Sequence, residues 1–361
     1  MYNKNMKFVL ISAEEFRKFA DKSQYRSFTQ TPEIANYRES EGWTSYYFAV
    51  KKNQEILAAA LALAKPTFMG KSLFTVPGGP LLDLEDAALT KFFLSNIESY
   101  AKSHNGYALH ISPYYELVQR DREGLIVENG FNHQKAVANL QSLGFKPVAN
   151  ASQPKYLFVL DIDGRSADSL WADFKGNTRN LIRKSERLGV TVRMVDRNEL
   201  CKFKKITEST SERRNFTDRS LAYYEKMYEL FTPRNEVKFM LAEVEIAGKI
   251  VPLSVAMFIL YGDEIIYLFS GSEQKYMHDY NAQYLIQWHM IEYAADHNFK
   301  RYNFYGIQGL PDPSSEGYGI YGFKKGFGGH VVELIGTYET PLSAFYYLSK
   351  IPSKIKSYLH R

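Results

Sequence analysis

The chain has 361 residues, which is long for one hydrophobic core and sufficient for two domains. Hydrophobic residues make up 45% and charged residues 24%, as in ordinary globular proteins, and the net charge of +5 mildly favours anionic partners such as phosphates, RNA or an anionic membrane. The single cysteine, Cys201, excludes an internal disulfide framework and fits a reducing compartment.

Neither a signal peptide nor a membrane span is expected from the sequence. Residues 1–10 contain no long apolar core and no small-residue cleavage site. The longest apolar run, Ile56 to Ala64, is far shorter than the roughly 20 residues that cross a bilayer. We therefore expect a cytoplasmic protein, located at most at the inner face of the membrane.

The first half is predicted to contain a hairpin, a helix and a further strand. Residues 46–50 turn at 52–54 into the strand 56–64. A helix within 89–105 ends in Tyr100-Ala101 and His104-Asn105, and the strand 107–111 follows. Residues 141–146 resemble a helix-to-strand turn.

The second half repeats this order. It begins with the strand 156–161 and a helix N-capped by Ser166. A hairpin is predicted over 239–260, a strand over 265–270, a helix from Ala282 and a strand over 301–304. The pairs Tyr293-Ala294 and His297-Asn298 match those of the first half at a constant offset, which indicates an internal repeat. The pattern predicts an α/β (α+β) fold with two tandem acetyltransferase-like (GNAT-like) domains and mostly antiparallel central sheets. The expected domains are residues 1–153 and 154–333, with 334–361 packing back on the first.

A predicted helix over 175–188 is strongly basic. Only Glu186 offsets its cations, which fall four residues apart on one face with Lys184 beside them: Lys175, Arg179, Arg183 and Arg187. This pattern fits a ridge that follows the phosphates of RNA or a nucleotide diphosphate. It fits a solvated helix face equally well.

Two further segments carry cations beside aromatic residues. Arg219 and Tyr223 lie four apart at the start of a predicted helix, where backbone N–H groups favour an anion. Residues 319–329 place Lys324 and Lys325 among glycines and aromatic residues. We expect a loop there, whose backbone approaches a large, negatively charged substrate.

Several common catalytic motifs are missing from the sequence. Neither half contains the pyrophosphate loop of coenzyme A-dependent acetyltransferases, and there is no Gly-x-Ser-x-Gly elbow or Walker loop. The eight histidines are scattered, without the spacing of a metal site. No metal and no cofactor are expected.

Taken together, these residues resemble the Fem family, aminoacyl-tRNA-dependent transferases that build the interpeptide bridges of peptidoglycan. The resemblance spans essentially the whole chain. It rests on five segments: Gln30-Thr31-Pro32-Glu33, the helix of residues 175–189, Arg219 with Tyr223, Ser270-Gly271-Ser272, and Phe323-Lys324-Lys325-Gly326-Phe327. The resemblance implies two acetyltransferase-like domains with a cleft between them. No extended heptad pattern lies between Lys184 and Arg219, so the chain resembles the compact type, which lacks a helical arm.

The resemblance also implies roles for individual residues. Lys324 corresponds to the lysine of the Phe-Lys motif and is the candidate catalytic donor to the carbonyl oxygen. The candidate substrate-binding residues are Arg38, Arg219, Tyr223, Phe323 and Lys325, and the candidate tRNA-binding residues are Lys175, Arg179, Arg183, Lys184 and Arg187. One position departs from the family pattern, because Ser112 stands where relatives often have Asp.

The implied reaction moves Ala, Ser or Gly from aminoacyl-tRNA to the stem-peptide lysine of UDP-MurNAc-pentapeptide or lipid II, by a monomeric enzyme. Two alternatives remain: a tandem acyltransferase that uses a small thioester, and a non-catalytic protein that binds RNA or a muropeptide. The C-terminal tail, with Lys350, Lys354, Lys356 and Arg361, either lies on an anionic membrane or packs on its own domain.

Overall fold

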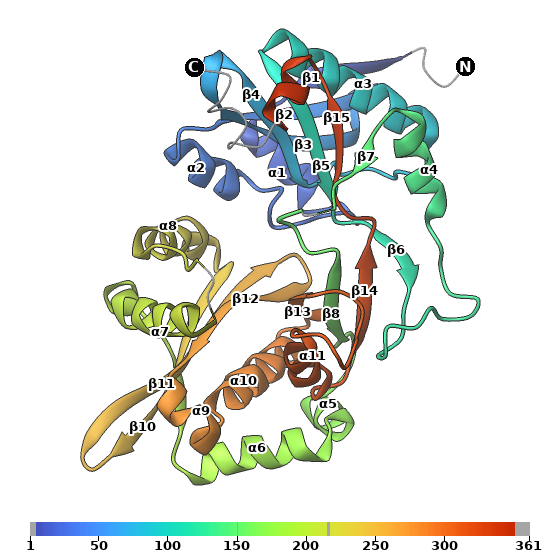
Figure 1. The fold of residues 1–361 in the computed structure, drawn as a ribbon. Helices are drawn as coiled ribbons and strands as arrows, with labels where there is room; N and C mark the ends of the chain where they lie inside the picture. The colour runs from blue at the N-terminus through green and yellow to red at the C-terminus, as the bar shows by residue number, and fades with distance from the viewer. Residues whose placement is uncertain (1–4, 150, 215–216, 351–361) are drawn as a thin grey trace. The chain divides into compact units, whose positions relative to one another are not determined.

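The computed structural model describes residues 5–149, 151–214 and 217–350, and the chain divides into two compact units (Figure 1). Unit 1 comprises Met1–Val118, Phe131–Lys155 and Leu334–Arg361, and unit 2 comprises Gln119–Gly130 and Tyr156–Glu333. The predicted mixed α/β fold is confirmed, because each unit is built around one sheet that carries helices.

Unit 1 contains a seven-stranded sheet in the order β1-β2-β3-β4-β5-β15-β7. Its strands are β1 (Met6–Leu10), β2 (Thr44–Lys52), β3 (Glu55–Pro66), β4 (Ser72–Gly78), β5 (Gly106–Pro113), β7 (Lys146–Pro147) and β15 (Tyr338–Pro341). Neighbouring strands are antiparallel, except that β4 and β5 are parallel. Its helices are α1 (Ala13–Ala20), α2 (Pro32–Ser40), η1 (Phe68–Gly70), α3 (Ala87–Ser103), α4 (Gln134–Ser142) and α12 (Phe345–Ser349).

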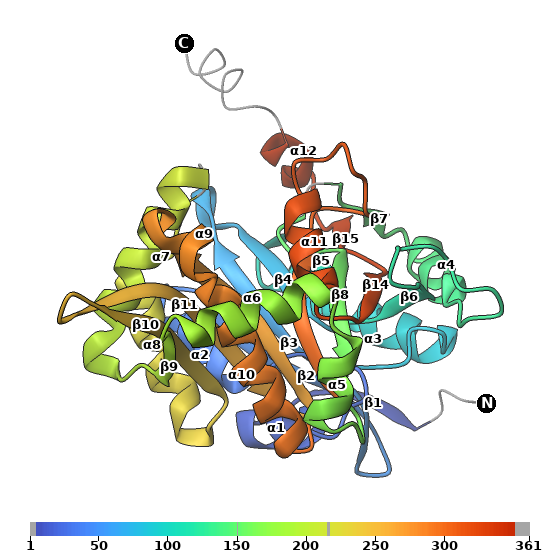
Figure 2. The ribbon, with the colours of Figure 1, turned by 90° about the horizontal axis from the view of Figure 1, so that it is seen from below.

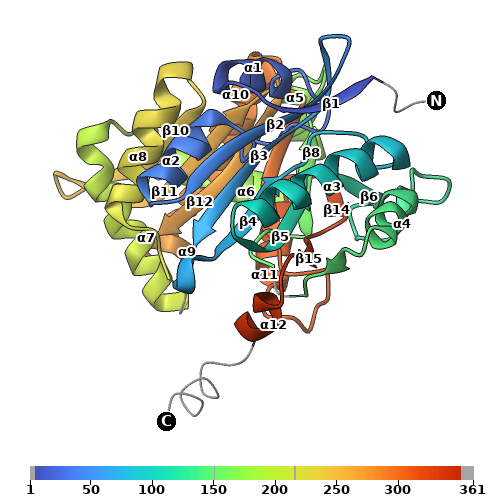
Figure 3. The same cartoon turned by 90° about the horizontal axis from the view of Figure 1, so that it is seen from above.

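The apolar run in β3 forms the centre of unit 1. Residues 58–64 are all buried, which is typical of a strand covered on both faces. The helix α3 lies across one face (Figure 3), and its Phe93 and Ile97 share a core cluster with the even-numbered alanines of β3. The buried Gln30 side chain forms two hydrogen bonds with the backbone of Leu61 on β3: its Nε2 donates to the carbonyl oxygen, and its Oε1 accepts from the amide. This part of the Gln-Thr-Pro-Glu segment therefore has a structural role.

Unit 2 contains the second sheet, in the order β14-β8-β13-β12-β11-β10-β9, with β6 (Glu116–Gln119) at its β14 edge where the chain enters the unit. Its strands are β8 (Tyr156–Asp161), β9 (Thr191–Met194), β10 (Val237–Ile246), β11 (Lys249–Tyr261), β12 (Glu264–Ser272), β13 (Arg301–Ile307) and β14 (His330–Leu334). Its helices are α5 (Ala167–Asp173), α6 (Gly176–Arg187), η2 (Arg197–Glu199), α7 (Leu200–Arg214), α8 (Leu221–Phe231), η3 (Thr232–Arg234), α9 (Gln274–Tyr280), α10 (Ala282–Asp296) and α11 (Tyr318–Lys325). In Figure 2, α6 and α10 lie against each other in front of the sheet of unit 2.

The predicted internal repeat is confirmed at the level of topology. The hairpin β2–β3 and the unit α3–β5 correspond to the hairpin β10–β11 and the unit α10–β13, and in each unit the helix connects two parallel neighbours. The sequence analysis missed β4, which corresponds to the predicted strand β12. None of the helices in the described part of the chain combines the length and apolarity needed to cross a membrane.

Candidate functional site

The parallel strands β12 and β13 of unit 2 are paired along only part of their length. The pairing joins Glu264–Ile266 to Arg301–Asn303 and stops there, although the two strands continue to Ser272 and Ile307. In unit 1 the corresponding pairing of β4 and β5 extends from Ser72 to Gly78. The two strands therefore separate at their carboxyl ends, which is a common place for ligands in α/β folds, and we call this unpaired part of β12 and β13 the opening.

Tyr305 causes the break in this ladder. Its backbone has a φ of +64°, which is unfavourable for a residue with a side chain, and the pairing of β13 with β8 is irregular between Asn303 and Gly306. The buried Asn303 side chain holds this conformation, because its Oδ1 accepts a hydrogen bond of 2.7 Å from the Tyr305 amide. The carbonyl groups beyond Asn303 are thereby released from the ladder with β12.

Lys324, on α11, donates hydrogen bonds to these carbonyl groups. Its Nζ lies 2.6 Å from the oxygen of Gly306 and 3.2 Å from that of Tyr305. The side chain is only 5% exposed and forms no ion pair within the described residues. Burial lowers the pKa of Lys324 from the usual value of 10.5 to about 7, so both protonation states are populated near neutral pH.

The glycine-rich segment around Lys324 is a helix and not the predicted loop. Tyr321 anchors α11, because its buried ring lies against Phe158 and its hydroxyl donates to the Arg122 carbonyl at 2.8 Å. These tertiary contacts outweigh the low helix propensity of glycine. Two of the glycines serve packing: a Cβ on Gly326 would lie 2.3 Å from Thr178 Oγ1, and one on Gly329 would lie 2.2 Å from the Val159 carbonyl oxygen.

The two neighbours of Lys324 have structural contacts of their own. Lys325 pairs with the carboxylate of Glu123, and this hydrogen bond holds the pKa of Glu123 below its usual range. Phe323 is half-buried, and its ring packs edge-on against Tyr284 at 4.9 Å. Both residues were predicted to bind substrate, and both fix α11 to the rest of unit 2.

Arg219 and Tyr223 lie close to Tyr305. Arg219 is exposed just before the Ser220 N-cap of α8, and its guanidinium lies 5.2 Å from the ring centre of Tyr223 and 5.8 Å from that of Phe269 on β12. Burial raises the pKa of Tyr305 to about 12, and the neighbouring Tyr223 and Arg219 contribute opposing electrostatic effects. Arg219 forms no ion pair within the described part of the chain, so its charge is available to an anion.

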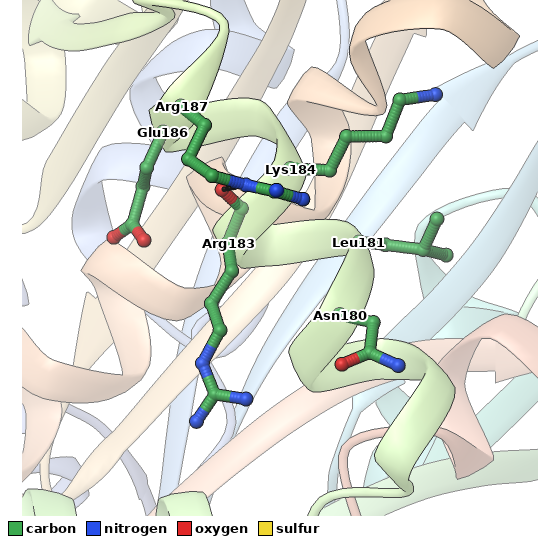
Figure 4. A pocket seen from close by; sticks show the side chains of 6 residues that line it. All are labelled: Asn180, Leu181, Arg183, Lys184, Glu186 and Arg187. Carbon is green, nitrogen blue, oxygen red and sulfur yellow. Dashed lines mark hydrogen bonds between the residues drawn. The ribbon is translucent and has the colours of Figure 1, made fainter.

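The residues of the basic helix α6 are divided between structural and exposed positions. Arg179 donates to the Ala172 carbonyl at 2.7 Å, and Lys184 reaches the His278 carbonyl at 3.4 Å. Lys175, Arg183 and Arg187 are exposed, and Arg183 lies over the Trp171 ring at 5.3 Å. A shallow hollow of about 730 Å³ follows this helix, lined by Asn180, Leu181, Arg183, Lys184, Glu186 and Arg187 (Figure 4).

The remaining predicted residue, Arg38, belongs to unit 1. It lies on α2, its guanidinium lies over the Trp43 ring at 4.8 Å, and it pairs with Glu41 at 2.6 Å. Ser112, at the position where relatives often have Asp, lies with its hydroxyl 2.9 Å from that of Thr337.

The sequence analysis missed the residues that link the others. Tyr305 connects Lys324 to the Arg219 and Tyr223 pair, and Phe269 supplies a second ring beside Arg219. Asp218 fixes the approach to α8, since its carboxylate accepts from Lys204, Thr207 and Tyr224. The sequence feature that could have drawn attention to Tyr305 is the Tyr-Gly pair at the end of an apolar strand. Among the described residues, no group of three or more His, Cys, Asp or Glu side chains could hold a metal ion.

Comparison with known proteins gives consistent matches over the whole chain. The model of the FemAB family matches residues 11–249 and 244–354. The aminoacyltransferase FemA of Staphylococcus epidermidis is 28% identical over 410 aligned positions, covering 94% of this chain and 96% of the relative, and FemA of Staphylococcus aureus is 27% identical, covering 97% and 100%. These alignments are longer than this chain, so each relative contains residues that this chain lacks. Between Lys184 and Arg219 the described residues form only β9, η2 and the 15-residue α7, without a long helical hairpin.

Solved structures confirm the fold. The crystal structure of FemX superimposes with a TM-score of 0.83 at 21% identity, covering 95% of this chain and 99% of that one. A tandem GNAT protein from the clavulanic acid biosynthesis pathway superimposes with a TM-score of 0.57 at 10% identity, covering 94% and 99%. Both units of this chain therefore have the GNAT-like fold that the repeat predicted.

Proposed function

Because the chain belongs to the FemAB family, we propose that it is an aminoacyltransferase of peptidoglycan bridge synthesis. Its curated relatives are named aminoacyltransferases. In this proposal it moves Ala, Ser or Gly from aminoacyl-tRNA to the stem-peptide lysine of UDP-MurNAc-pentapeptide or lipid II, and so starts or extends the bridge. The observation that carries the proposal is the opening between β12 and β13, where Lys324 donates a hydrogen bond to the Tyr305 carbonyl and the charge of Arg219 acts on the Tyr305 side chain.

The reaction is the aminolysis of an ester. The neutral amine of the acceptor attacks the carbonyl carbon, the oxyanion that forms collapses, and the ribose hydroxyl oxygen leaves with the proton that the amine loses. The acceptor lysine has a free pKa near 10.4, so its neutral form costs about 4–5 kcal/mol at pH 7. The ester itself is activated, and the enzyme has to orient the reactants and stabilise the oxyanion.

Lys324 is our candidate for the oxyanion donor. Two of its N–H groups are directed to the carbonyl oxygens of Tyr305 and Gly306, which leaves one N–H of the ammonium for a substrate oxygen. A donor fixed in this way requires no reorganisation during the reaction, and one such donor is worth about 3–4 kcal/mol.

Arg219 and Tyr223 are our candidates for binding the diphosphate of the acceptor. Arg38, which lies in unit 1, stays a candidate for substrate binding through the resemblance alone. The guanidinium of Arg219 stacks on Tyr223 and Phe269, which orients it without neutralising its charge. Phe323 and Lys325 act in this proposal by fixing α11. The candidate tRNA surface consists of Lys175, the N-cap of α6, and of Arg179, Arg183, Lys184 and Arg187 within the helix. In this proposal the exposed Lys175, Arg183 and Arg187 contact phosphates.

The proposal is tested by incubating the protein with UDP-MurNAc-pentapeptide and tRNA charged with Ala, Ser or Gly, followed by mass spectrometry of the acceptor. The addition of one residue that depends on charged tRNA is the expected result. Product with lipid II alone would assign the acceptor to the membrane surface, where the basic tail provides contact. Product from an acyl thioester without tRNA would replace the proposal with the small-thioester alternative. Tight binding of tRNA or of the acceptor without product would favour the alternative of a non-catalytic binding protein.

A further inference from the structure

Unit 1 carries an exposed apolar surface made by two segments far apart in the sequence. The η1 turn between β3 and β4 exposes 56% of Phe68 and 77% of Met69, and α12 exposes 65% of Tyr347 and 55% of Leu348. The two segments lie side by side, because the Phe68 ring is 5.0 Å from the Phe345 ring of α12. We call Phe68, Met69, Tyr347 and Leu348 the apolar tip.

The helix α12 is apolar on both of its faces. Phe345 is 9% exposed and packs against Tyr107 of the sheet at 5.2 Å. Ala344, Tyr347 and Leu348, three and four residues apart, form its outer face and are all exposed. A surface helix normally presents polar residues to water, so an apolar outer face indicates contact with a second apolar phase.

Hydrogen bonds hold both segments in place. The amide and the hydroxyl of Thr67 each donate to the Lys71 carbonyl at 2.7 Å, which closes the η1 turn. Behind α12, the Glu339 carboxylate accepts from the Tyr346 hydroxyl at 2.8 Å and from Lys350 Nζ at 2.9 Å. The apolar tip is therefore presented by a fixed scaffold, which reduces the entropy lost when it binds.

The charge around the apolar tip identifies its partner. Lys65 and Lys71 flank the η1 turn, whereas Lys350 is paired with Glu339. Residues 351–361 contain no Asp or Glu and add Lys354, Lys356 and Arg361. The last three lie outside the described residues and contribute here by their charge alone. A second copy of the chain would bring like charges together, whereas an anionic lipid surface would take up aromatic and apolar side chains beside lysines.

We propose that the apolar tip inserts into the interface of an anionic membrane, with Lys65 and Lys71 against the lipid headgroups. This inference gives a surface to the membrane contact proposed above and does not depend on the transfer chemistry. In this proposal the η1 turn and α12 insert together, and the basic tail alone is not sufficient for membrane binding.

The test is sedimentation of the full chain with vesicles, without tRNA or acceptor. The vesicles contain phosphatidylcholine with phosphatidylglycerol, or phosphatidylcholine alone. The double variant Met69→Asn/Leu348→Gln removes apolar contact and keeps the fold, since Met69 has a φ of +59° that Asn adopts readily. The matched control is Leu125→Gln/Ile250→Thr, which replaces side chains of 66% and 61% exposure in unit 2.

We expect binding to the anionic vesicles that salt weakens, and a loss of at least about tenfold in the double variant, since buried apolar groups dominate interfacial insertion. The control variant is expected to bind like the wild type. Three results would overturn the inference: no binding of the wild type to anionic vesicles, equal binding of the double variant, or a dimer in solution that the double variant dissociates. Loss of transfer activity with intact vesicle binding would affect only the proposed function.

Discussion

At the scale of single residues, the proposed reaction depends on the protonation state of Lys324. Its ammonium group donates to two backbone carbonyl oxygens, and burial brings its pKa to about 7. A donor of this kind acts only while it is protonated. A general base at the same position would act only while it is neutral. The two roles therefore predict opposite effects of pH.

We predict that the pH profile of transfer to the acceptor changes slope at about pH 7, and we call this change the break. The logarithm of kcat/KM for the acceptor rises with unit slope below this pH, because its neutral amine becomes more abundant, and is flat above it, because Lys324 loses its proton. The variant Lys324→Arg stays protonated and should lose the break, whereas Lys325→Gln should keep it. A slope of two below the break and one above it would instead make Lys324 the base.

We predict a second pH effect, on stability. The pKa of Lys324 is lower in the folded state, about 7, than the usual 10.5, so the unfolded chain binds more protons between these values and stability rises with pH. Relative to Lys324→Met, the free energy of unfolding of the wild type should increase by up to about 1.4 kcal/mol for each pH unit between about 7 and 10.

Urea unfolding, followed by tryptophan fluorescence in a Trp43→Phe background, measures this effect, since the other two tryptophans, Trp171 and Trp288, pack together in unit 2. Stability curves of the two proteins that run parallel from pH 7 to 10 would show that Lys324 keeps its usual pKa.

At the scale of elements, periodicity in the sequence was sufficient for the hairpins and for the helices α3, α6 and α10. It was not sufficient for α11, since the glycine content of that segment favours a loop and its helix depends on distant partners such as Arg122 and Glu123. The opening between β12 and β13 could not be predicted either, because it depends on strand register and on the backbone conformation of Tyr305. The resemblance to a family selected Lys324, Arg219 and Tyr223 without showing what lies between them.

Two glycines of the α11 segment should respond to alanine in opposite directions. Gly322 has open space around it, so Gly322→Ala should stabilise unit 2 by up to about 1 kcal/mol through helix propensity. Gly326→Ala should destabilise it by about 1–3 kcal/mol, because the new Cβ would clash with Thr178 Oγ1. Adding Thr178→Ala should recover part of the lost stability, since the Thr178 Cβ would lie 3.6 Å from the new methyl group, whereas the Phe323 carbonyl oxygen at 3.1 Å remains a tight contact. Thermal unfolding of the three variants would refute this account if all shifted in the same direction.

The basic helix α6 gives a prediction about tRNA. Arg183→Gln/Arg187→Gln removes two exposed cations and should raise the Kd for tRNA about tenfold or more, since each charge-assisted hydrogen bond is worth about 1.5–3 kcal/mol. The salt dependence of log K should also become shallower by roughly 1–2 units. Lys91→Gln/Lys102→Gln, on the exposed face of α3, is the matched control. Equal effects of both pairs would make α6 an ordinary solvated face.

At the scale of the whole molecule, the chain contains the same strand pairing twice and uses it differently. The parallel pair β4–β5 of unit 1 is closed along its length, and the pair β12–β13 of unit 2 is open at its carboxyl end. The repeat was visible in the sequence because the Tyr-Ala and His-Asn pairs at the helix ends recur at a constant offset and a hairpin precedes each helix. The difference between the repeats was not, since it depends on the Tyr305 conformation and on a lysine that arrives from α11.

The most direct test of the central claim is single-turnover transfer from charged tRNA to UDP-MurNAc-pentapeptide, measured for the wild type, Lys324→Met and Lys325→Met. We predict transfer by the wild type, a loss of about 10²–10³-fold in Lys324→Met, and a smaller loss in Lys325→Met, because one oxyanion donor is worth about 3–4 kcal/mol. Transfer by Lys324→Met within about threefold of the wild type would contradict the role of Lys324, given that an essential donor contributes at least about tenfold to the rate.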